Sequence, residues 1–147
     1  MEPLDLSVRP PRSCYEELDG LMFMPRTIDK LRALLPGGNP GGYIINTKIL
    51  GMSGYLLQRL GITEEALSAA VASAKDETEV AAWVRANTDA SQYSAINKTL
   101  RRIRPKHAGD EAFFRQMYAE VLAADPQLEY TLDIIEADDR RMFGANA

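Results

Sequence analysis

The sequence has 147 residues, 46% of them hydrophobic and 26% charged, with a net charge of −4 at pH 7. These values are typical of a globular chain, and we expect residues 1–147 to form one domain with its own hydrophobic core. A single cysteine, Cys14, excludes a secreted disulfide scaffold. The opening residues resemble no signal peptide, and no stretch is apolar enough for a membrane span, so we expect a cytoplasmic protein without a membrane partner.

The first 23 residues are predicted to form an extended, irregular arm. Pro10 and Pro11 disfavour helical backbone in the residues that precede them. Apolar side chains along the arm require it to pack against the rest of the domain. These side chains are Leu4, Leu6, Val8, Tyr15, Leu18, Leu21 and Phe23.

Helical periodicity begins at Pro25, a residue type that suits the first turn of a helix. Ile28, Leu31 and Leu35 then share one face, and Pro36 with the glycines after it ends this helix. Similar spacing and capping signals predict six more helices. They cover about 47–60, 63–74, the residues after Asp76, 91–104, 110–124 and 131–143. The predicted fold class is therefore mainly α, a single compact domain of about six or seven helices with an irregular N-terminal arm.

The helix predicted after Asp110 has the most regular apolar spacing in the chain. Apolar side chains at helical spacing are typical of a face that packs against the core. We therefore expect its apolar residues and the one tryptophan to be largely buried. This predicted core set is Trp83, Phe113, Phe114, Met117, Val121 and Leu122.

The glycine-rich stretch 37–42 does not have the pattern of a phosphate-binding loop. A Walker loop carries Lys and then Ser or Thr directly after its last glycine, whereas Gly42 is followed by Tyr43 and Ile44. We interpret the stretch as a turn after the first helix, followed by a short extended piece over residues 43–45.

No group of residues has the spacing of a metal site or of a catalytic nucleophile with its base. The chain contains one cysteine and one histidine, Cys14 and His107, which are too few for a zinc site. The last predicted helix carries carboxylates at helical spacing, and we interpret them as a solvated or salt-bridged face rather than as metal ligands. They are Asp133, Glu136, Asp138 and Asp139. We expect neither a metal nor another cofactor.

Positive charge is concentrated in residues 91–109, whereas residues 110–147 are acidic. The basic residues of this segment are Lys98, Arg101, Arg102, Arg104 and Lys106. The favoured interpretation is that the two blocks pair within the chain or between subunits, and the main alternative is that the basic block is a solvated helix face. Because no aromatic residue is interleaved for stacking on bases, nucleic acid is not the expected partner.

The candidate functional cluster lies around the first helix. Asp29 has Arg26 three residues before it and Arg32 three residues after it, which predicts ion pairs on the helix surface. Arg26 in the first turn, with Arg12 of the arm, suits an anion. The favoured interpretation is structural, an Arg26–Asp29 pair that anchors the arm. The whole cluster comprises Arg12, Arg26, Asp29, Lys30 and Tyr43.

Three groups of residues form a signature. The N-terminal group reads Pro10-Pro11-Arg12-Ser13, Leu18-x-Gly20 and Met24-Pro25-Arg26-x-Ile28-Asp29-Lys30-x-Arg32-Ala33. The middle group reads Leu56-Leu57-x-x-Leu60-Gly61-Ile62 and Glu79-Val80-x-x-Trp83-Val84, and the last group is the acidic segment 131–139. Together they resemble the bacterial DUF5069 family over most of the chain, with departures at Leu31 and in the glycine-enriched loop. The resemblance implies a small, mostly helical, cytosolic protein and carries over no catalytic residue, substrate or cofactor.

Two interpretations of the function follow. The favoured one is a non-enzymatic interaction or regulatory domain, with a homodimer as one form of it. The alternative is an enzyme or a module that binds a phosphometabolite or another small anion, with Arg12, Arg26, Asp29 and Lys30 around a pocket closed by the glycine loop and Tyr43. Convergence of the basic side chains on a concave site favours the alternative, and pairing with internal carboxylates favours the first.

Overall fold

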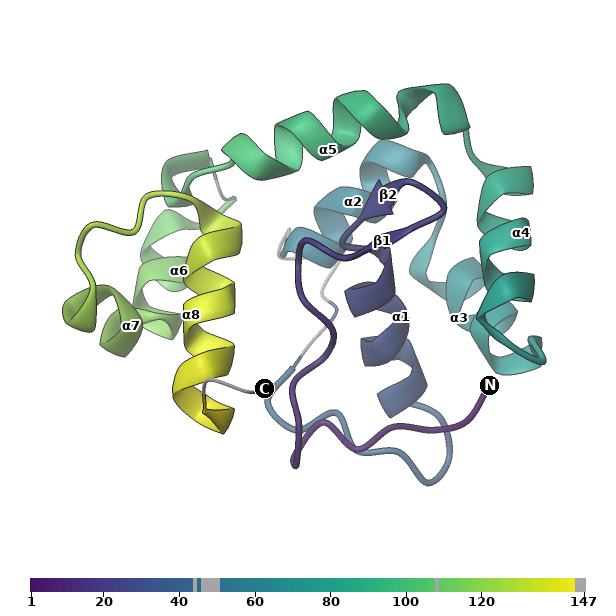
Figure 1. Cartoon of the computed structure of the whole chain (residues 1–147), viewed down its shortest axis with the longest axis horizontal. Coiled ribbons are helices and arrows are strands. Elements are labelled where there is room, and N and C mark those ends of the chain that lie inside the picture. Colours follow the sequence, from purple (N-terminus) through teal and green to yellow (C-terminus); the bar gives the residue numbers. More distant parts are fainter. Residues whose placement is uncertain (44, 46–50, 108, 145–147) are drawn as a thin grey trace.

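The computed structural model describes residues 1–43, 45, 51–107 and 109–144, and this part of the chain forms one mainly helical domain (Figure 1). The predicted fold class is confirmed. Eight α-helices occur among the described residues, one more than the upper expectation. They are α1 (Met24–Ala33), α2 (Met52–Leu60), α3 (Glu64–Ser73), α4 (Glu77–Asn87), α5 (Tyr93–Arg102), α6 (Glu111–Met117), α7 (Ala119–Ala124) and α8 (Thr131–Phe143).

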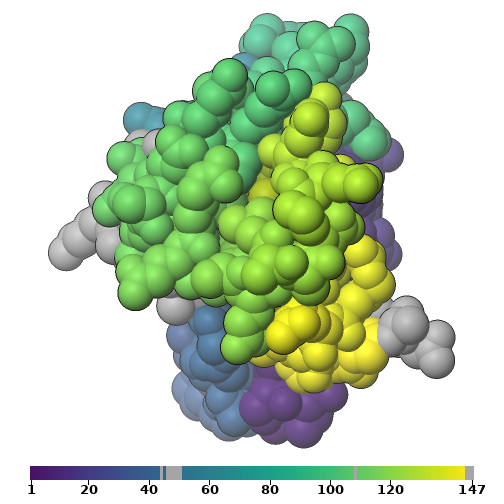
Figure 2. Space-filling view, turned by 90° about the vertical axis from the view of Figure 1, so that its left-hand side faces the viewer, coloured from purple at the N-terminus to yellow at the C-terminus, as the bar shows by residue number. Residues whose placement is uncertain are grey.

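Helix α5 connects the two ends of the molecule. In Figure 1 it runs across the top, from α4 at one end to α6, α7 and α8 at the other. The 3-10 turns Ala90–Gln92 and Pro105–His107 precede and follow it. Figure 2 shows the face that is formed by α6, α7 and the segment leading into α8.

The core surrounds α1, because the apolar faces of the neighbouring helices converge on it. Side-chain N-caps begin two of these helices, since Thr63 accepts a hydrogen bond from the Ala66 amide and Asp76 accepts one from the Glu79 amide. Fully buried apolar residues come from α1, α2, α3, α4, α5 and α8. They include Ile28, Leu31, Leu56, Leu67, Val71, Val80, Ile96, Leu100 and Leu132.

The arm contains a hairpin that our sequence analysis did not predict. β1 (Glu17–Leu18) pairs antiparallel with β2 (Leu21–Met22) through Asp19 and Gly20, whose φ angles are 54° and 85°. An Asp-Gly pair with positive φ at both positions is a signal for a two-residue hairpin. Asn97 of α5 holds this hairpin, because its Oδ1 accepts from the Met22 amide at 2.9 Å.

The start of the arm lies against the glycine loop. The Leu6 amide donates to the carbonyl of Asn39 at 2.8 Å, and the Asn39 amide donates to the carbonyl of Leu4 at 2.9 Å. Gly41 has a φ of 57°, and a Cβ at this position would lie 2.8 Å from the Leu6 carbonyl oxygen. The loop therefore needs this glycine in order to receive the arm. Val8 is 72% exposed, so its predicted burial is wrong.

The helix predicted over 110–124 is divided into α6 and α7 at Tyr118, whose φ and ψ are −107° and 23°. The burial predicted for its aromatic face is also wrong. Phe113 and Met117 are 41% and 47% exposed, and of the predicted set only Val121 lies in the core. Trp83, Phe114 and Leu122 are partly buried.

The helix predicted over 47–60 is described from Met52 onward, as α2. Residues 46–50, and Ile44 of the predicted extended piece, lie outside the described residues. Among the helices that are described, none is long and apolar enough to cross a membrane.

Candidate functional site

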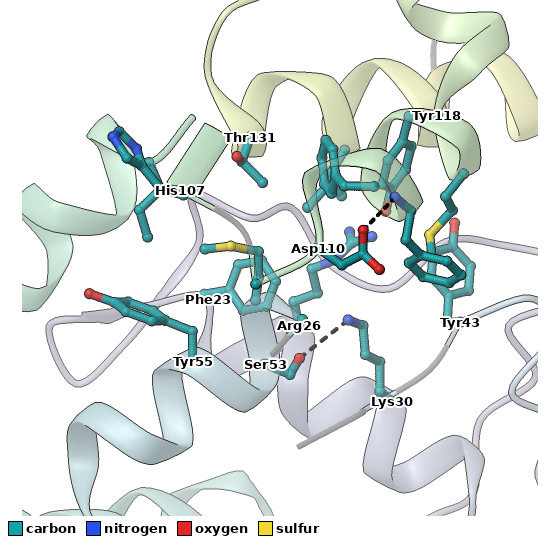
Figure 3. Close-up of a pocket in the computed structure, with 18 of the residues that line it drawn as sticks. Phe23, Arg26, Lys30, Tyr43, Ser53, Tyr55, His107, Asp110, Tyr118 and Thr131 are labelled. Atoms are coloured by element: carbon teal, nitrogen blue, oxygen red, sulfur yellow. Dashed lines mark hydrogen bonds between the residues drawn. The ribbon is translucent and has the colours of Figure 1, made fainter. Parts of the chain in front are cut away.

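A cavity of about 560 Å³ lies beside α1, with walls from α2, α5, α6 and the start of α8 (Figure 3). Its volume lies within the range of small-molecule sites. Apolar side chains form much of the wall: Phe23, Ile103, Phe113, Phe114, Met117 and Ile135. The apolar face of α6 was predicted to be core but lines this cavity instead. Titratable side chains also reach it: Arg26, Lys30, Tyr43, Tyr55, Arg102, His107, Asp110 and Tyr118.

Lys30 of α1 presents its amine to the cavity. Its Nζ donates to the Ser53 hydroxyl of α2 at 3.2 Å, a contact that Figure 3 shows, and lies 5.4 Å from the ring centre of Phe23. In the part of the chain that the structure describes, no carboxylate forms an ion pair with Lys30. Burial and the positive charge of Arg26 together lower the pKa of Lys30 to about 7, although the charge of Asp139 opposes this shift. Both protonation states of this amine are therefore populated near neutral pH.

Arg26 lies one helical turn before Lys30 and is 1% exposed. Its Nη1 and Nη2 donate to the two carboxylate oxygens of Asp139 in α8, at 2.7 and 3.3 Å. The Tyr43 hydroxyl donates to the same carboxylate at 2.7 Å, and its ring lies 5.4 Å from the guanidinium carbon. The charge of Arg26 is thus compensated, but its buried Nε has no hydrogen-bond partner among the described residues.

Thr131, the first residue of α8, supplies a second buried polar atom of this kind. Its Oγ1 has no hydrogen-bond partner among the described residues, and the residue lines the same cavity as Arg26. Buried polar groups are almost always hydrogen-bonded, so each exception calls for an explanation. Both such atoms in the described part of the chain belong to residues that line one cavity. This coincidence indicates a place for a hydrogen-bonding ligand.

Asp110 and Tyr118 complete the polar part of the wall. Asp110 caps α6, accepting from the Phe113 amide at 2.9 Å, a hydrogen bond that Figure 3 shows. Burial raises the pKa of Tyr118, and burial with the hydrogen bond to Asp139 raises that of Tyr43. Both phenols therefore stay protonated at neutral pH.

Arg12 and Asp29 form a separate cluster that joins the arm to the helices. Asp29 is 2% exposed and accepts from the Arg12 backbone amide at 2.8 Å and from Arg12 Nη2 at 3.0 Å. Arg12 also contacts Glu77 of α4, with 3.0 Å between Nη1 and Oε2. Arg26 Nη1 donates to the Arg12 carbonyl at 3.2 Å. Arg12 and Asp29 are thus satisfied by partners within the protein, and neither residue lines the cavity beside α1.

The predicted surface pairs of Asp29 with Arg26 and Arg32 are wrong. Arg26 pairs with Asp139, and Arg32 Nε donates to the Glu2 carbonyl at 2.8 Å. A spacing of three residues favours an ion pair on an exposed helix surface. Residues 26 and 29 of α1 are instead buried, and each charge meets a partner that is distant in the sequence.

The cysteine and two of the acidic residues singled out in the sequence are buried or hydrogen-bonded within the protein. Cys14 is buried, and burial raises the pKa of its thiol to about 12, which makes it a poor nucleophile. Asp133 accepts from the Tyr15 hydroxyl, and Glu136 accepts from the Ser13 hydroxyl at 2.8 Å. In residues 1–43, 45, 51–107 and 109–144, no cluster of His, Cys, Asp and Glu could hold a metal ion.

The basic block makes few contacts with acidic residues. Arg104 lies 3.6 Å from Glu129, and the structure shows no other ion pair of this block among the described residues. Arg101 packs over the ring of Tyr15 at 5.5 Å. Pairing between two subunits and the homodimer stay predictions.

The sequence predicts a site near Lys30, Arg26 and Tyr43. It does not predict the contribution of Ser53, Thr131 or the α6 wall. No local pattern singles out Ser53 or Thr131, because their role depends on the approach of α2 and α8 to α1. The regular apolar spacing after Asp110 marks the helix face that forms this wall. The same spacing is typical of a face buried in the core, which is the position that the sequence predicts.

The chain belongs to the DUF5069 family, since the family's sequence model matches residues 8–141. The family is described as a domain of unknown function. Comparison with curated protein sequences finds no match. Lys30, Arg26, Ser53 and Thr131 all lie within the matched range.

Proposed function

We propose that this protein binds a small organic carboxylate in the cavity beside α1. The observation that carries the proposal is that Lys30 and both buried atoms without a partner, Arg26 Nε and Thr131 Oγ1, belong to residues lining this one cavity. Of the two sequence interpretations, the anion-binding one fits Lys30. It does not fit Arg12 or Asp29, whose charges are used within the protein.

The chemistry of the ligand follows from the two parts of the wall. A carboxylate accepts several hydrogen bonds and gives the Lys30 ammonium a counter-charge, which supports the charged form of the lysine. Phe113, Phe114 and Met117 supply apolar and aromatic surface for the body of the ligand. A carboxylate attached to an aryl or alkyl chain satisfies both parts, whereas a fully hydrated sugar phosphate would leave the apolar wall without a partner.

The test is calorimetric titration with 4-phenylbutanoate, supported by thermal denaturation. At 100 times its dissociation constant, the acid should stabilise the fold by about 2.7 kcal/mol. Lys30→Met should weaken binding by more than about tenfold, because removing a charge-assisted contact costs roughly 1.5–3 kcal/mol. Lys98→Met removes an exposed lysine of α5 that does not line the cavity and should bind normally.

The neutral amide 4-phenylbutanamide is the matched control for the ligand, because it keeps the apolar body and lacks the charge. We expect it to bind much more weakly than the acid. Equal affinity of wild type and Lys30→Met for the acid, or no binding of the acid to the wild type, would contradict the proposed function.

A further inference from the structure

We propose that Lys30 is a nucleophile that forms an imine with a 2-oxo acid held in the cavity, an inference that rests on the carboxylate-binding function above. The substrate class is an aryl- or alkyl-substituted 2-oxo acid, and Lys30 bonds to it covalently.

The surroundings of Lys30 are those of an activated amine. Its Nζ faces a cavity with a largely apolar wall and, among the described residues, has a neutral hydroxyl rather than a carboxylate as its partner. A lysine amine becomes nucleophilic when it is desolvated beside another cation. Arg26 is that cation, four residues earlier on the same helix, and the lowered pKa of Lys30 agrees with this arrangement.

The position of Arg26 favours a 2-oxo acid over a simple aldehyde. Residues four apart on a helix present neighbouring side chains, and Arg26 and Lys30 both line the cavity, so they border adjacent parts of one ligand. In a 2-oxo acid the keto carbon is bonded directly to the carboxylate. A carboxylate bound beside Arg26 and Thr131, which both line the cavity, therefore brings the keto carbon toward Lys30.

The step is a condensation of an amine with a carbonyl. The lone pair of neutral Nζ attacks the keto carbon, a C–N bond forms, the carbonyl π bond breaks, and one nitrogen proton moves to the oxygen to give a carbinolamine. The hydroxyl then leaves as water with the second nitrogen proton, and the C=N bond forms. Nothing is oxidised or reduced. Ser53, whose hydroxyl lies 3.2 Å from Nζ and 3.3 Å from Thr27 Oγ1, is positioned to relay the proton.

The charged and titratable groups around Lys30 do not prevent imine formation by its neutral amine. Arg26 of the same helix is paired with Asp139 of α8, and the thiol of Cys14 in the arm stays protonated. Tyr43 and Tyr118 also stay protonated. Asp110 lines the cavity as the cap of α6 and, among the described residues, forms no ion pair with Lys30. The amine is therefore not held permanently in its charged form by a neighbouring carboxylate.

The experiment is reductive trapping with 4-phenyl-2-oxobutanoate and sodium cyanoborohydride, which adds hydride to the imine carbon and makes the bond permanent. Mass spectrometry of the intact chain should show one adduct, heavier by the mass of the oxo acid less one oxygen atom. Peptide mapping of the wild type should place it on Lys30, at least tenfold above the exposed lysines Lys75, Lys98 and Lys106. This site map needs no variant to fold.

Lys30→Arg separates the two proposals, because arginine keeps the positive charge and is not a nucleophile. This variant should bind 4-phenylbutanoate and give no adduct with the oxo acid. Binding of both acids to the wild type without a Lys30 adduct, or adducts spread evenly over the lysines, overturns the imine while the proposed function stands. Failure of both acids to bind overturns both.

Discussion

Replacing Asp139 with alanine is expected to lower the free energy of unfolding by about 3–5 kcal/mol, because it leaves the Arg26 guanidinium buried and uncompensated. Arg26 is 1% exposed, and Asp139 accepts from both of its terminal nitrogens and from the Tyr43 hydroxyl. Urea denaturation of wild type and variant measures the loss.

Asp138→Ala is the matched control, since Asp138 is the neighbouring carboxylate on α8 and is only partly buried. Its replacement should have a much smaller effect. The double variant Arg26→Met/Asp139→Leu should recover much of the lost stability, because it removes both charges together. A cost for Asp139→Ala no greater than that for Asp138→Ala would show that the Arg26 pair does not hold α8 against α1.

Replacing Asp29 with alanine is expected to cost roughly 3 kcal/mol and to release the N-terminal arm. Asp29 is buried and accepts from both the backbone amide and the guanidinium of Arg12, so its loss removes the arm's main polar attachment to α1. Limited trypsin digestion should cut faster after Arg12, and urea denaturation should show the lower stability.

Glu77→Ala provides the comparison, because Glu77 contacts the same guanidinium from a partly exposed position on α4. An exposed ion pair contributes at most about 1 kcal/mol, so this variant should stay resistant to trypsin. If Asp29→Ala is no more sensitive to trypsin than Glu77→Ala, the Asp29–Arg12 contact does not hold the arm.

Helix boundaries followed from sequence wherever an apolar stripe meets the core. The limits predicted for α8 match Thr131–Phe143, and the helices predicted to start at Thr63, Asp76 and Asp110 are capped by these side chains. Periodicity failed for α6, because it reports that a helix face is apolar and not what that face contacts. Phe113 and Met117 lie on such a face, which borders a cavity.

Sequence spacing also fails to identify the partners of the charged residues in the candidate cluster. Sequence spacing grouped Arg12, Arg26, Asp29, Lys30 and Tyr43, and the structure divides them between an arm attachment, a buried ion pair and the cavity wall. Arg26 and Asp139 are 113 positions apart, and Arg12 and Glu77 are 65 apart. Local spacing carries no information about such partners. Only the tertiary structure shows that Lys30 has no carboxylate partner among the described residues.

Affinity for a carboxylate ligand should depend on pH in a defined direction. Lys30 has a pKa of about 7 in the folded protein, below the ordinary value of 10.5. Binding favours the protonated amine, so above pH 7 the protein must take up a proton in order to bind. The affinity for 4-phenylbutanoate therefore falls as the pH rises above about 7.

The most direct test of the site is an NMR titration of the Lys30 side chain, with and without 4-phenylbutanoate, assigned with Lys30→Arg. We predict a pKa near 7 in the free protein, set by burial and Arg26, and a higher pKa with the acid bound, because its carboxylate favours the ammonium. A Lys30 pKa near 10.5 both with and without the acid would contradict the account, because it would describe a solvated lysine that does not contact the ligand.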